Sequence, residues 1–370
     1  MKWSWHIVTI SGIPVYLHGT FLLLMLFLVV QELASGASVA SAVASLLFLL
    51  AIFATVVAHE FGHALTARRY GIRTRDVTLY PIGGLARLER IPEVPRQELW
   101  VALAGPAVNL AIAAIMFVVV GAWSIEELPA SLEAGGSPWM RFIAVNLWLA
   151  LFNLIPAFPM DGGRALRALL AERFEYVRAT EIAASLGQGV ALLFGFIGLF
   201  TNPFLVFIAL FVWMGATAEA STVSLRTALA GIPVGRAMIT DFRTLESTDT
   251  LRHAAELVLA GSQHDFPVLG GGRVAGILAR DAMVRAIAER GLDSPVGEAM
   301  ATRFETADVR EMLEQAFARL QACECPVLPV MQDDRLVGLL TSDNVGEFVM
   351  IRGALSQQGG QRGHQAARGA

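Results

Sequence analysis

The sequence predicts an α-helical membrane protein with six transmembrane helices, followed by a cytoplasmic α/β module built from two repeats. Composition is the first observation, because 55% of the 370 residues are hydrophobic and only 16% are charged, a balance that is unusual for a soluble globular chain. The second observation is a set of six apolar segments before residue 222, and the third is a sequence repeat after it.

The six apolar segments are interpreted as transmembrane helices. A hydrocarbon core of about 30 Å requires about 20 helical residues, which the second, third and fourth segments provide. The first segment is shorter, and only Thr201-Asn202-Pro203 separates the last two, as in a tight turn between antiparallel helices. The predicted segments are 19–33, 39–63, 98–123, 139–158, 182–200 and 203–221.

The distribution of arginine predicts the orientation of these helices. Arginines are concentrated after the second, fourth and sixth segments, whereas the connection between the third and fourth carries Glu126, Glu127 and Glu133. Because positively charged connections remain in the cytoplasm, we expect a multi-pass protein of the cell membrane with both termini and the repeat module in the cytoplasm. The net charge is only −4 and no basic run is present, so a nucleic-acid partner is not expected.

The two cysteines, Cys323 and Cys325, lie in the polar C-terminal region. A Cys-x-Cys pair without further ligands makes a poor zinc site. We interpret both as reduced cytoplasmic thiols.

The motif His59-Glu60-Phe61-Gly62-His63 follows the apolar run 39–58. Residues four apart share a helix face, so the two imidazoles can bind one zinc ion. Glu60 lies about 100° away around the helix, where it can act on a water at the metal without ligating it. Two histidines at a helix end, satisfied by backbone carbonyls or solvent, are the alternative. Ionisable groups at the end of a membrane helix are costly, which favours a functional site.

Asp161 is the candidate for a third ligand, which a catalytic zinc site requires together with an open position for water. It lies in the segment 153–164, where Pro156 and Pro159 interrupt the fourth predicted helix and Gly162-Gly163 allow sharp turns. Irregular backbone at membrane depth is tolerated only where it is buried or lines a wet cavity. The predicted topology places this segment on the same side as the histidines. The alternative is an exit turn with a helix-capping aspartate.

Together, the two motifs resemble the site-2 protease family of intramembrane zinc metalloproteases, which pair HExxH with a later NxxPxxPxDGG segment. The resemblance covers residues 1–222 and extends to Leu-Ala-Gly-Pro-Ala-Val-Asn at 103–109 and Pro-Ile-Gly-Gly at 81–84. Met160 stands where the family usually has leucine. By this resemblance, His59, His63 and Asp161 bind one zinc ion per chain. Glu60 is then the general base, which takes a proton from water and delivers it to the leaving amine.

Four further residues are candidates for supporting roles in substrate binding. Asn109 and Asn153 are polar groups within predicted helices, and each either orients substrate or oxyanion or forms a helix-packing hydrogen bond. A substrate helix must unwind before it is cut, because its carbonyls are bonded to amides four residues on. The segment 76–89, which contains Gly83 and Gly84, can then pair with the unwound strand by adding a β-edge.

The region after residue 221 is a tandem repeat. Pro-Val-Gly-Arg-Ala-Met at 233–238 recurs as Pro-Val-Gly-Glu-Ala-Met at 295–300, and the segment 266–281 recurs at 328–343 with the same offset. Each copy predicts a lead strand, a helix, two short strands and a helix. A constant offset indicates a true repeat, and this one resembles a tandem pair of cystathionine-β-synthase-type (CBS) domains.

The expected domain boundaries follow from these assignments. They are 1–222 for the intramembrane metalloprotease domain, 223–232 for a linker, 233–292 and 293–352 for CBS domains 1 and 2, and 353–370 for a disordered tail.

CBS pairs often bind adenine nucleotides, with a ribose-binding pattern Gly-x-x-Thr/Ser-x-x-Asp. Copy two has Gly338 and Thr341, but Asn344 stands at the last position, with Asp343 one place earlier. Copy one has Ala279 at the hydroxyl position and Ala282 at the last position of the pattern. Two hypotheses remain open: an adenine-nucleotide site at Thr341 and Asp343, and a module that dimerises or docks substrate.

The sequence thus predicts a zinc-dependent intramembrane endopeptidase that cuts membrane-anchored proteins in or near their transmembrane segments, in regulated signalling proteolysis. Its expected partners are the substrate protein, the bilayer, an adenine nucleotide and a second copy of the chain. The alternative is a CBS-gated transporter or channel with a His/Asp ion site, which leaves Glu60 unexplained and lacks a visible inverted repeat. A catalytically inactive scaffold is disfavoured because all four motif residues are intact.

Overall fold

The computed structural model describes residues 3–90, 92, 94–120, 137–323 and 325–354. Glu126, Glu127 and Glu133 lie outside the described residues, as does the predicted tail beyond residue 354. The chain divides into two compact units, Met1–Val223 and Ser224–Ala370.

A four-stranded sheet of order β1-β2-β3-β4 supports the second helix of the first unit. The hairpin β1 (Ser4–Ile10) and β2 (Ile13–His18) pairs through β2 in parallel with β3 (Thr74–Tyr80), and β3 pairs antiparallel with β4 (Gly83–Leu88). Val15 lies opposite Val77, and both pack on Phe61 and Ala64. The sheet is therefore fixed against the turn of helix that carries the His-Glu motif, with β4 at its edge.

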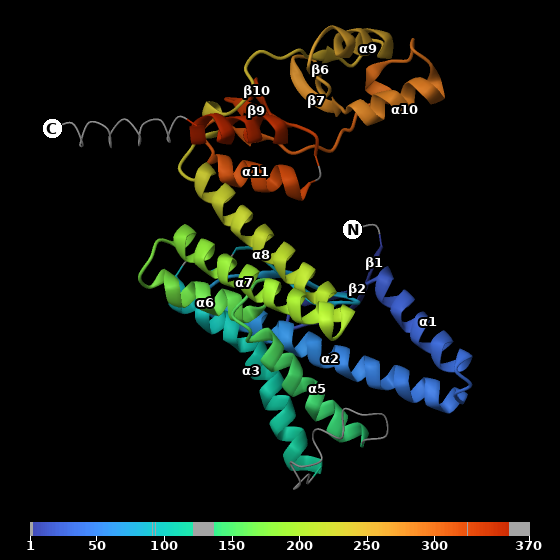
Figure 1. Ribbon diagram of the computed structural model, residues 1–370. Helices are drawn as coiled ribbons and strands as arrows, with labels where there is room; N and C mark the ends of the chain where they lie inside the picture. Colours follow the sequence, from blue (N-terminus) through green and yellow to red (C-terminus); the bar gives the residue numbers. More distant parts are fainter. Residues whose placement is uncertain (1–2, 91, 93, 121–136, 324, 355–370) are drawn as a thin grey trace, which may run out of the picture. The chain divides into compact units, whose positions relative to one another are not determined.

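The helices of the first unit are drawn in Figure 1. Ser38 caps the second of them by accepting from Ser41 N, and the helix ends at Arg69 just before Gly71, whose φ of 73° is left-handed. The bounds are α1 (Gly19–Ala34), α2 (Val39–Arg69), α3 (Pro95–Val120), α5 (Pro138–Asn153), α6 (Asp161–Ala171), α7 (Tyr176–Phe200) and α8 (Pro203–Leu229).

Four of these helices, α2, α3, α7 and α8, are long and apolar enough to cross a membrane. The helices α1 and α5 have 16 residues each, which span about 24 Å and fall short of a core of about 30 Å. The described residues therefore contain four membrane-length helices where six were predicted. The prolines explain the short α5, because the chain leaves the helix at Asn153, before Pro156.

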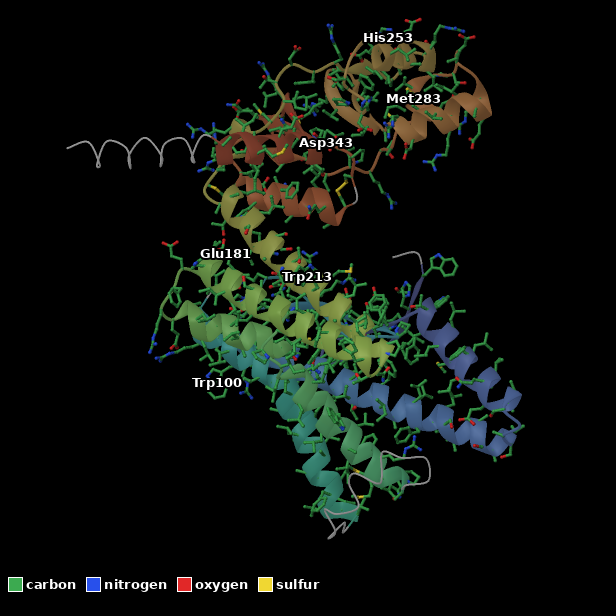
Figure 2. The ribbon with its side chains drawn as sticks, viewed as in Figure 1. Trp100, Glu181, Trp213, His253, Met283 and Asp343 are labelled. Atoms are coloured by element: carbon green, nitrogen blue, oxygen red, sulfur yellow. A yellow bond between two sulfur atoms is a disulfide. The ribbon has the colours of Figure 1, made fainter. Side chains whose placement is uncertain are left out.

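The outward faces of these helices expose large apolar side chains, including Trp100 and Trp213, which Figure 2 labels. A soluble monomer rarely exposes so much apolar surface, so these faces fit contact with lipid. Small residues lie between the helices instead. A Cβ added to Gly62 would lie 2.7 Å from the Ala104 carbonyl oxygen, so α2 and α3 approach each other closely at this glycine.

Arg167 of α6 is a fully buried cation that joins three other helices. Its side chain is 0% exposed and donates to Glu98 of α3 (2.5 and 2.8 Å) and to Glu219 of α8 (2.5 Å). The guanidinium also lies over the rings of Phe158 and Tyr176. A buried charge is tolerated only when it is paired in this way.

Replacing Arg167 tests this buried network. We expect Arg167→Leu to lower the free energy of unfolding by about 3–5 kcal/mol, because Glu98 would remain buried without its cation. Thermal or denaturant unfolding in detergent measures the change. Arg96→Leu is the matched control, since Arg96 pairs with Glu172 while 83% exposed, and such pairs contribute only about 0–1 kcal/mol. Equal stability of the two variants would contradict the prediction.

The second unit contains two three-stranded sheets, β5-β6-β7 and β10-β9-β8, one in each repeat. Both repeats show the predicted order of elements, and in copy two the last helix covers residues 342–354. The bounds are η1 (Val234–Arg236), β5 (Leu245–Glu246), α9 (Leu251–Ala260), β6 (Phe266–Gly270), β7 (Arg273–Leu278), α10 (Arg280–Arg290), η2 (Val296–Glu298), β8 (Ala307–Asp308), α11 (Leu313–Ala322), β9 (Leu328–Gln332) and β10 (Arg335–Leu340).

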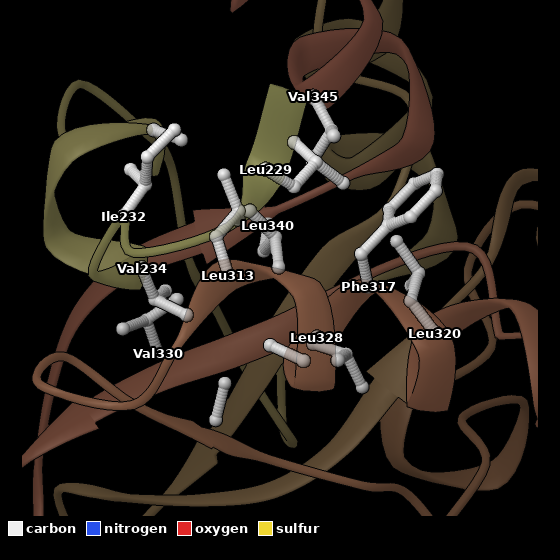
Figure 3. Packing of buried hydrophobic residues seen from close by; sticks show 13 residues of the cluster. Leu229, Ile232, Val234, Leu313, Phe317, Leu320, Leu328, Val330, Leu340 and Val345 are labelled. Atoms are coloured by element: carbon white, nitrogen blue, oxygen red, sulfur yellow. The ribbon is translucent and has the colours of Figure 1, made fainter. Parts of the chain in front are cut away.

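The segment that precedes the lead strand of each repeat packs into the core of the other repeat. Val234 N donates to the Glu311 carbonyl (2.8 Å), and Val234 packs into the core of copy two (Figure 3). In the same way, Val296 N donates to the Asp249 carbonyl (2.7 Å), and Val296 packs into the core of copy one. Each core is thus completed by a segment of the other repeat, so the cores do not follow the boundaries of the repeats.

The cysteines differ from the prediction. Cys323 and Cys325 form a disulfide, so the prediction of reduced thiols is wrong for this structure. Their Cα atoms lie 5.1 Å apart, a separation that disulfides commonly bridge. Both residues also pack against the hydrophobic core of copy two, which the Cys-x-Cys spacing alone does not reveal.

Candidate metal centre

Three predicted ligands from two distant segments meet in the first unit. His59 Nε2, His63 Nε2 and Asp161 Oδ2 lie 3.1 Å from one another. All three residues are buried, with exposures of 7%, 6% and 8%. Together they form a group of the kind that can hold a metal ion.

The segment between α5 and α6 brings Asp161 to the histidines. Asp161 is the first residue of α6, directly after this segment. Gly162 and Gly163 are helical residues and not turn residues, contrary to the sharp turns expected of them. Their role is close approach, because a Cβ on Gly163 would lie 2.6 Å from Ala157 C and one on Gly162 would strike the Leu154 and Ile155 carbonyls. The segment therefore folds back against the start of α6.

Hydrogen bonds orient both imidazoles toward the group. His63 Nδ1 lies 2.7 Å from the Val101 carbonyl oxygen, and His59 Nδ1 lies 2.6 Å from Asn109 Oδ1. Each oxygen accepts a hydrogen bond from Nδ1–H, which leaves Nε2 of each neutral ring with a lone pair that faces the centre of the group. Two such lone pairs and a carboxylate oxygen form a donor set that a shared cation can satisfy.

Gly105 of α3 leaves room for that cation. A Cβ at this position would collide with Nε2 of both His59 and His63. The residue was part of the 103–109 pattern in the sequence, but its place beside Nε2 of both histidines emerges only from the packing of α3 on α2. Asn146, which bonds to Asn109, was also missed, although an isolated asparagine in a predicted membrane helix is a usable signal.

Glu60 lies beside the group and against the edge strand β4. Its Oε2 accepts from Ala86 N (3.1 Å). A Cβ on Gly84 would lie 2.7 Å from Glu60 Cγ, so the missing side chain at Gly84 leaves space for the carboxylate. Gly83 begins β4 with a φ of 140°. The structure therefore places the predicted base next to the predicted substrate-pairing strand.

The remaining predicted residues have other partners. Asn109 bonds to His59 and Asn146, while Asn153 donates from Nδ2 to the Leu149 carbonyl in its own helix (2.9 Å). In the second unit, Thr341 Oγ1 accepts from Asn344 N (3.2 Å) at the start of the last helix. Asp343 is exposed at the surface (Figure 2).

Comparison with known proteins identifies the family. The model of Peptidase family M50 matches residues 47–136 and 130–195, and the CBS domain model matches residues 234–289. Zinc metalloprotease MJ0392 of Methanocaldococcus jannaschii is 32% identical over 280 residues, which cover 75% of this chain and 78% of the relative. The chain belongs to peptidase family M50, the site-2 protease family.

Two other known proteins are similar to this chain. Putative zinc metalloprotease Rip3 of Mycobacterium tuberculosis is 29% identical over 316 residues, or 81% of this chain and 79% of the relative. The solved site-2 protease from Methanocaldococcus jannaschii is 36% identical, with a TM-score of 0.44 over 59% of this chain and 95% of that one. The protein is thus a zinc metalloprotease with a CBS domain, embedded through apolar helices.

The side chains of this M50 peptidase fit a catalytic zinc ion. Two imidazole nitrogens and one carboxylate oxygen are a common donor set for zinc sites that keep a position open for water. Donors about 2.0–2.1 Å from a tetrahedral zinc ion lie about 3.3 Å apart, close to the observed separation of 3.1 Å.

A methyl group at Gly105 tests the space reserved for the metal. We expect Gly105→Ala to lose zinc, because the added Cβ would push the histidine nitrogens out of position. Gly189→Ala in α7 is the control, since nothing lies within 4 Å of a Cβ there, and it should retain zinc. Metal analysis of the purified proteins makes the comparison, and wild-type zinc content in Gly105→Ala would contradict the assigned geometry.

Proposed function

We propose that this chain is a zinc-dependent intramembrane endopeptidase that hydrolyses peptide bonds in or near the transmembrane segments of membrane-anchored proteins. The observation that carries the proposal is the buried triad of His59, His63 and Asp161. Glu60 follows His59 on α2, and its carboxylate accepts from Ala86 N of β4. The four side chains combine a metal site with an adjacent base, in a unit whose helices are apolar enough to cross a membrane.

In this proposal, His59, His63 and Asp161 hold the zinc ion. When bound, zinc supplies Lewis acidity, which polarises a carbonyl and lowers the pKa of a water molecule. Glu60 accepts the proton of that water and delivers it to the leaving amine. Its Oε2 is oriented by Ala86 N–H, so Oε1 is the oxygen that moves the proton.

The outer edge of β4 is the proposed binding site for the unwound substrate. Ala86 lies opposite Val77 of β3, and its N–H donates to Oε2 of Glu60. Because β4 is the last strand of the sheet, its outer edge is where a substrate strand would add. A substrate paired there would have its backbone beside Glu60. Helix-weakening residues near the cut would lower the cost of unwinding.

The proposed location is the cell membrane, with six spans and with both termini and the CBS pair in the cytoplasm. The arginine distribution supports this orientation. The short α1 and α5 would be the first and fourth spans, with the segment after α5 continuing into the protein interior. A site open to the cytoplasm would release the cleaved domain there, as regulated signalling proteolysis requires.

The proposed role of the CBS pair is to regulate the protease or to dock its substrate, with dimerisation through the same module. An adenine nucleotide is one candidate ligand, and its ribose site would lie in copy two, where Thr341 and Asp343 stand near the turn after β10. Copy one has Ala279 where copy two has Thr341, and Ala282 where copy two has Asn344, and neither alanine offers a hydrogen-bonding side chain.

Calorimetric titration of the full chain with ATP, ADP and AMP tests the nucleotide hypothesis. If a ribose binds at Thr341, the titration should give measurable heat. Thr341→Val should reduce this heat, because valine keeps the shape of threonine but lacks its hydroxyl. Asp281→Asn in copy one is the control and should bind as the wild type does. No heat with any nucleotide would leave docking or dimerisation as the role of the pair.

Zinc content and cleavage together test the proposed chemistry. We expect about one zinc ion per wild-type chain, and a sharp loss in Asp161→Ala, because two histidines alone leave the metal under-coordinated. Glu60→Gln should keep zinc and lose cleavage of a single-span reporter that carries glycine and proline in its membrane helix. Wild-type protein without zinc, even after reconstitution, would remove the basis of the proposal. A Glu60→Gln variant that still cuts would remove Glu60 from its role.

A further inference from the structure

A chain of hydrogen bonds connects the metal-binding motif to a backbone carbonyl in α5. His59 Nδ1 lies 2.6 Å from Asn109 Oδ1, and Asn109 Nδ2 donates to Asn146 Oδ1 (3.1 Å). Asn146 Nδ2 in turn donates to the Phe142 carbonyl (2.9 Å). Both asparagines are 0% exposed, so the chain runs through α2, α3 and α5 away from solvent.

The carbonyl at the far end fixes the direction of every bond in this chain. Because Phe142 O can only accept, Asn146 must face it with its N–H group and present its amide oxygen to Asn109. Asn109 then donates from Nδ2 and presents its own oxygen to His59. That oxygen holds the His59 proton at Nδ1, which leaves the Nε2 lone pair free for the metal.

We propose that Asn146 is a positioning residue that keeps His59 in its metal-binding tautomer, an inference that rests on the proposed zinc site. Asn146 acts through Asn109, by preventing that carboxamide from rotating. A rotated Asn109 would present its N–H group to Nδ1 and favour the tautomer with a proton on Nε2, which cannot bind metal. His63 needs no such residue, because its Nδ1 faces the Val101 carbonyl directly (2.7 Å).

Two substitutions at Asn146 separate this role from simple packing. Asn146→Leu removes the acceptor for Asn109 and should weaken zinc binding by about 10- to 100-fold, the usual effect of losing such a partner. Asn146→Asp keeps an acceptor for Asn109 whether it is charged or protonated, and when protonated it also donates to Phe142. It should therefore bind zinc as the wild type does. Chelator competition with the detergent-solubilised full chain gives the zinc dissociation constants.

A rescue experiment adds a second substitution to the Asn146→Leu variant. Asn109→Asp in the Asn146→Leu background places a carboxylate beside His59 Nδ1. A carboxylate has no N–H group to turn toward the ring, so the correct tautomer is enforced without Asn146. We expect zinc affinity to return toward the wild-type value, which would not happen if Asn146→Leu acted only by disturbing helix packing.

Thr180→Val is the matched control. It removes another buried hydrogen bond to a carbonyl four residues earlier, from Thr180 Oγ1 to Tyr176 O (2.8 Å), and should leave zinc affinity unchanged. Wild-type affinity in a folded Asn146→Leu variant overturns the proposal, as does weak binding by Asn146→Asp or failure of the rescue. If Asn146→Leu does not fold, as judged by thermal unfolding, Asn146→Ala takes its place, because it also removes the acceptor for Asn109. Absence of zinc from the wild type would instead count against the proposed zinc site.

Discussion

The first unit is organised around the convergence of three electron-pair donors inside a protein interior. His59 Nε2, His63 Nε2 and Asp161 Oδ2 are electron-pair donors that a shared cation can bind, and burial removes the water that would otherwise screen them. The surrounding structure satisfies this constraint in two ways. Gly105 leaves the required volume, and oxygen acceptors behind both rings direct the nitrogen lone pairs inward.

Close backbone contact makes the convergence possible. The two motifs are far apart in the sequence, so their helices must meet with little side-chain volume between them. Gly62 allows α2 to approach the backbone of α3, and Gly162 and Gly163 allow the segment after α5 to lie on α6. The same helices are held together on one side by the buried Arg167, whose carboxylate partners lie on α3 and α8. Small residues and one paired charge thus replace the large apolar core of a soluble domain.

The chemistry-bearing residues could be found from the sequence because their signals are local. A spacing of four residues places His59 and His63 on one helix face, and the charge distribution predicts that Asp161 lies on the same side of the membrane. The residues that the sequence did not reveal act across helices. Asn146 and the Val101 carbonyl reach the site only through tertiary packing. Hydropathy likewise marked the segment 139–158 as one span, although α5 ends at Asn153.

The position of Glu60 connects substrate binding to catalysis. Its Oε2 accepts from the Ala86 N–H of β4, so the strand proposed to bind substrate also orients the base, and Oε1 remains to move the proton. A peptide that adds to this edge would have its backbone beside the carboxylate that acts on it. The contact that would bind the unwound chain would therefore also place it for hydrolysis.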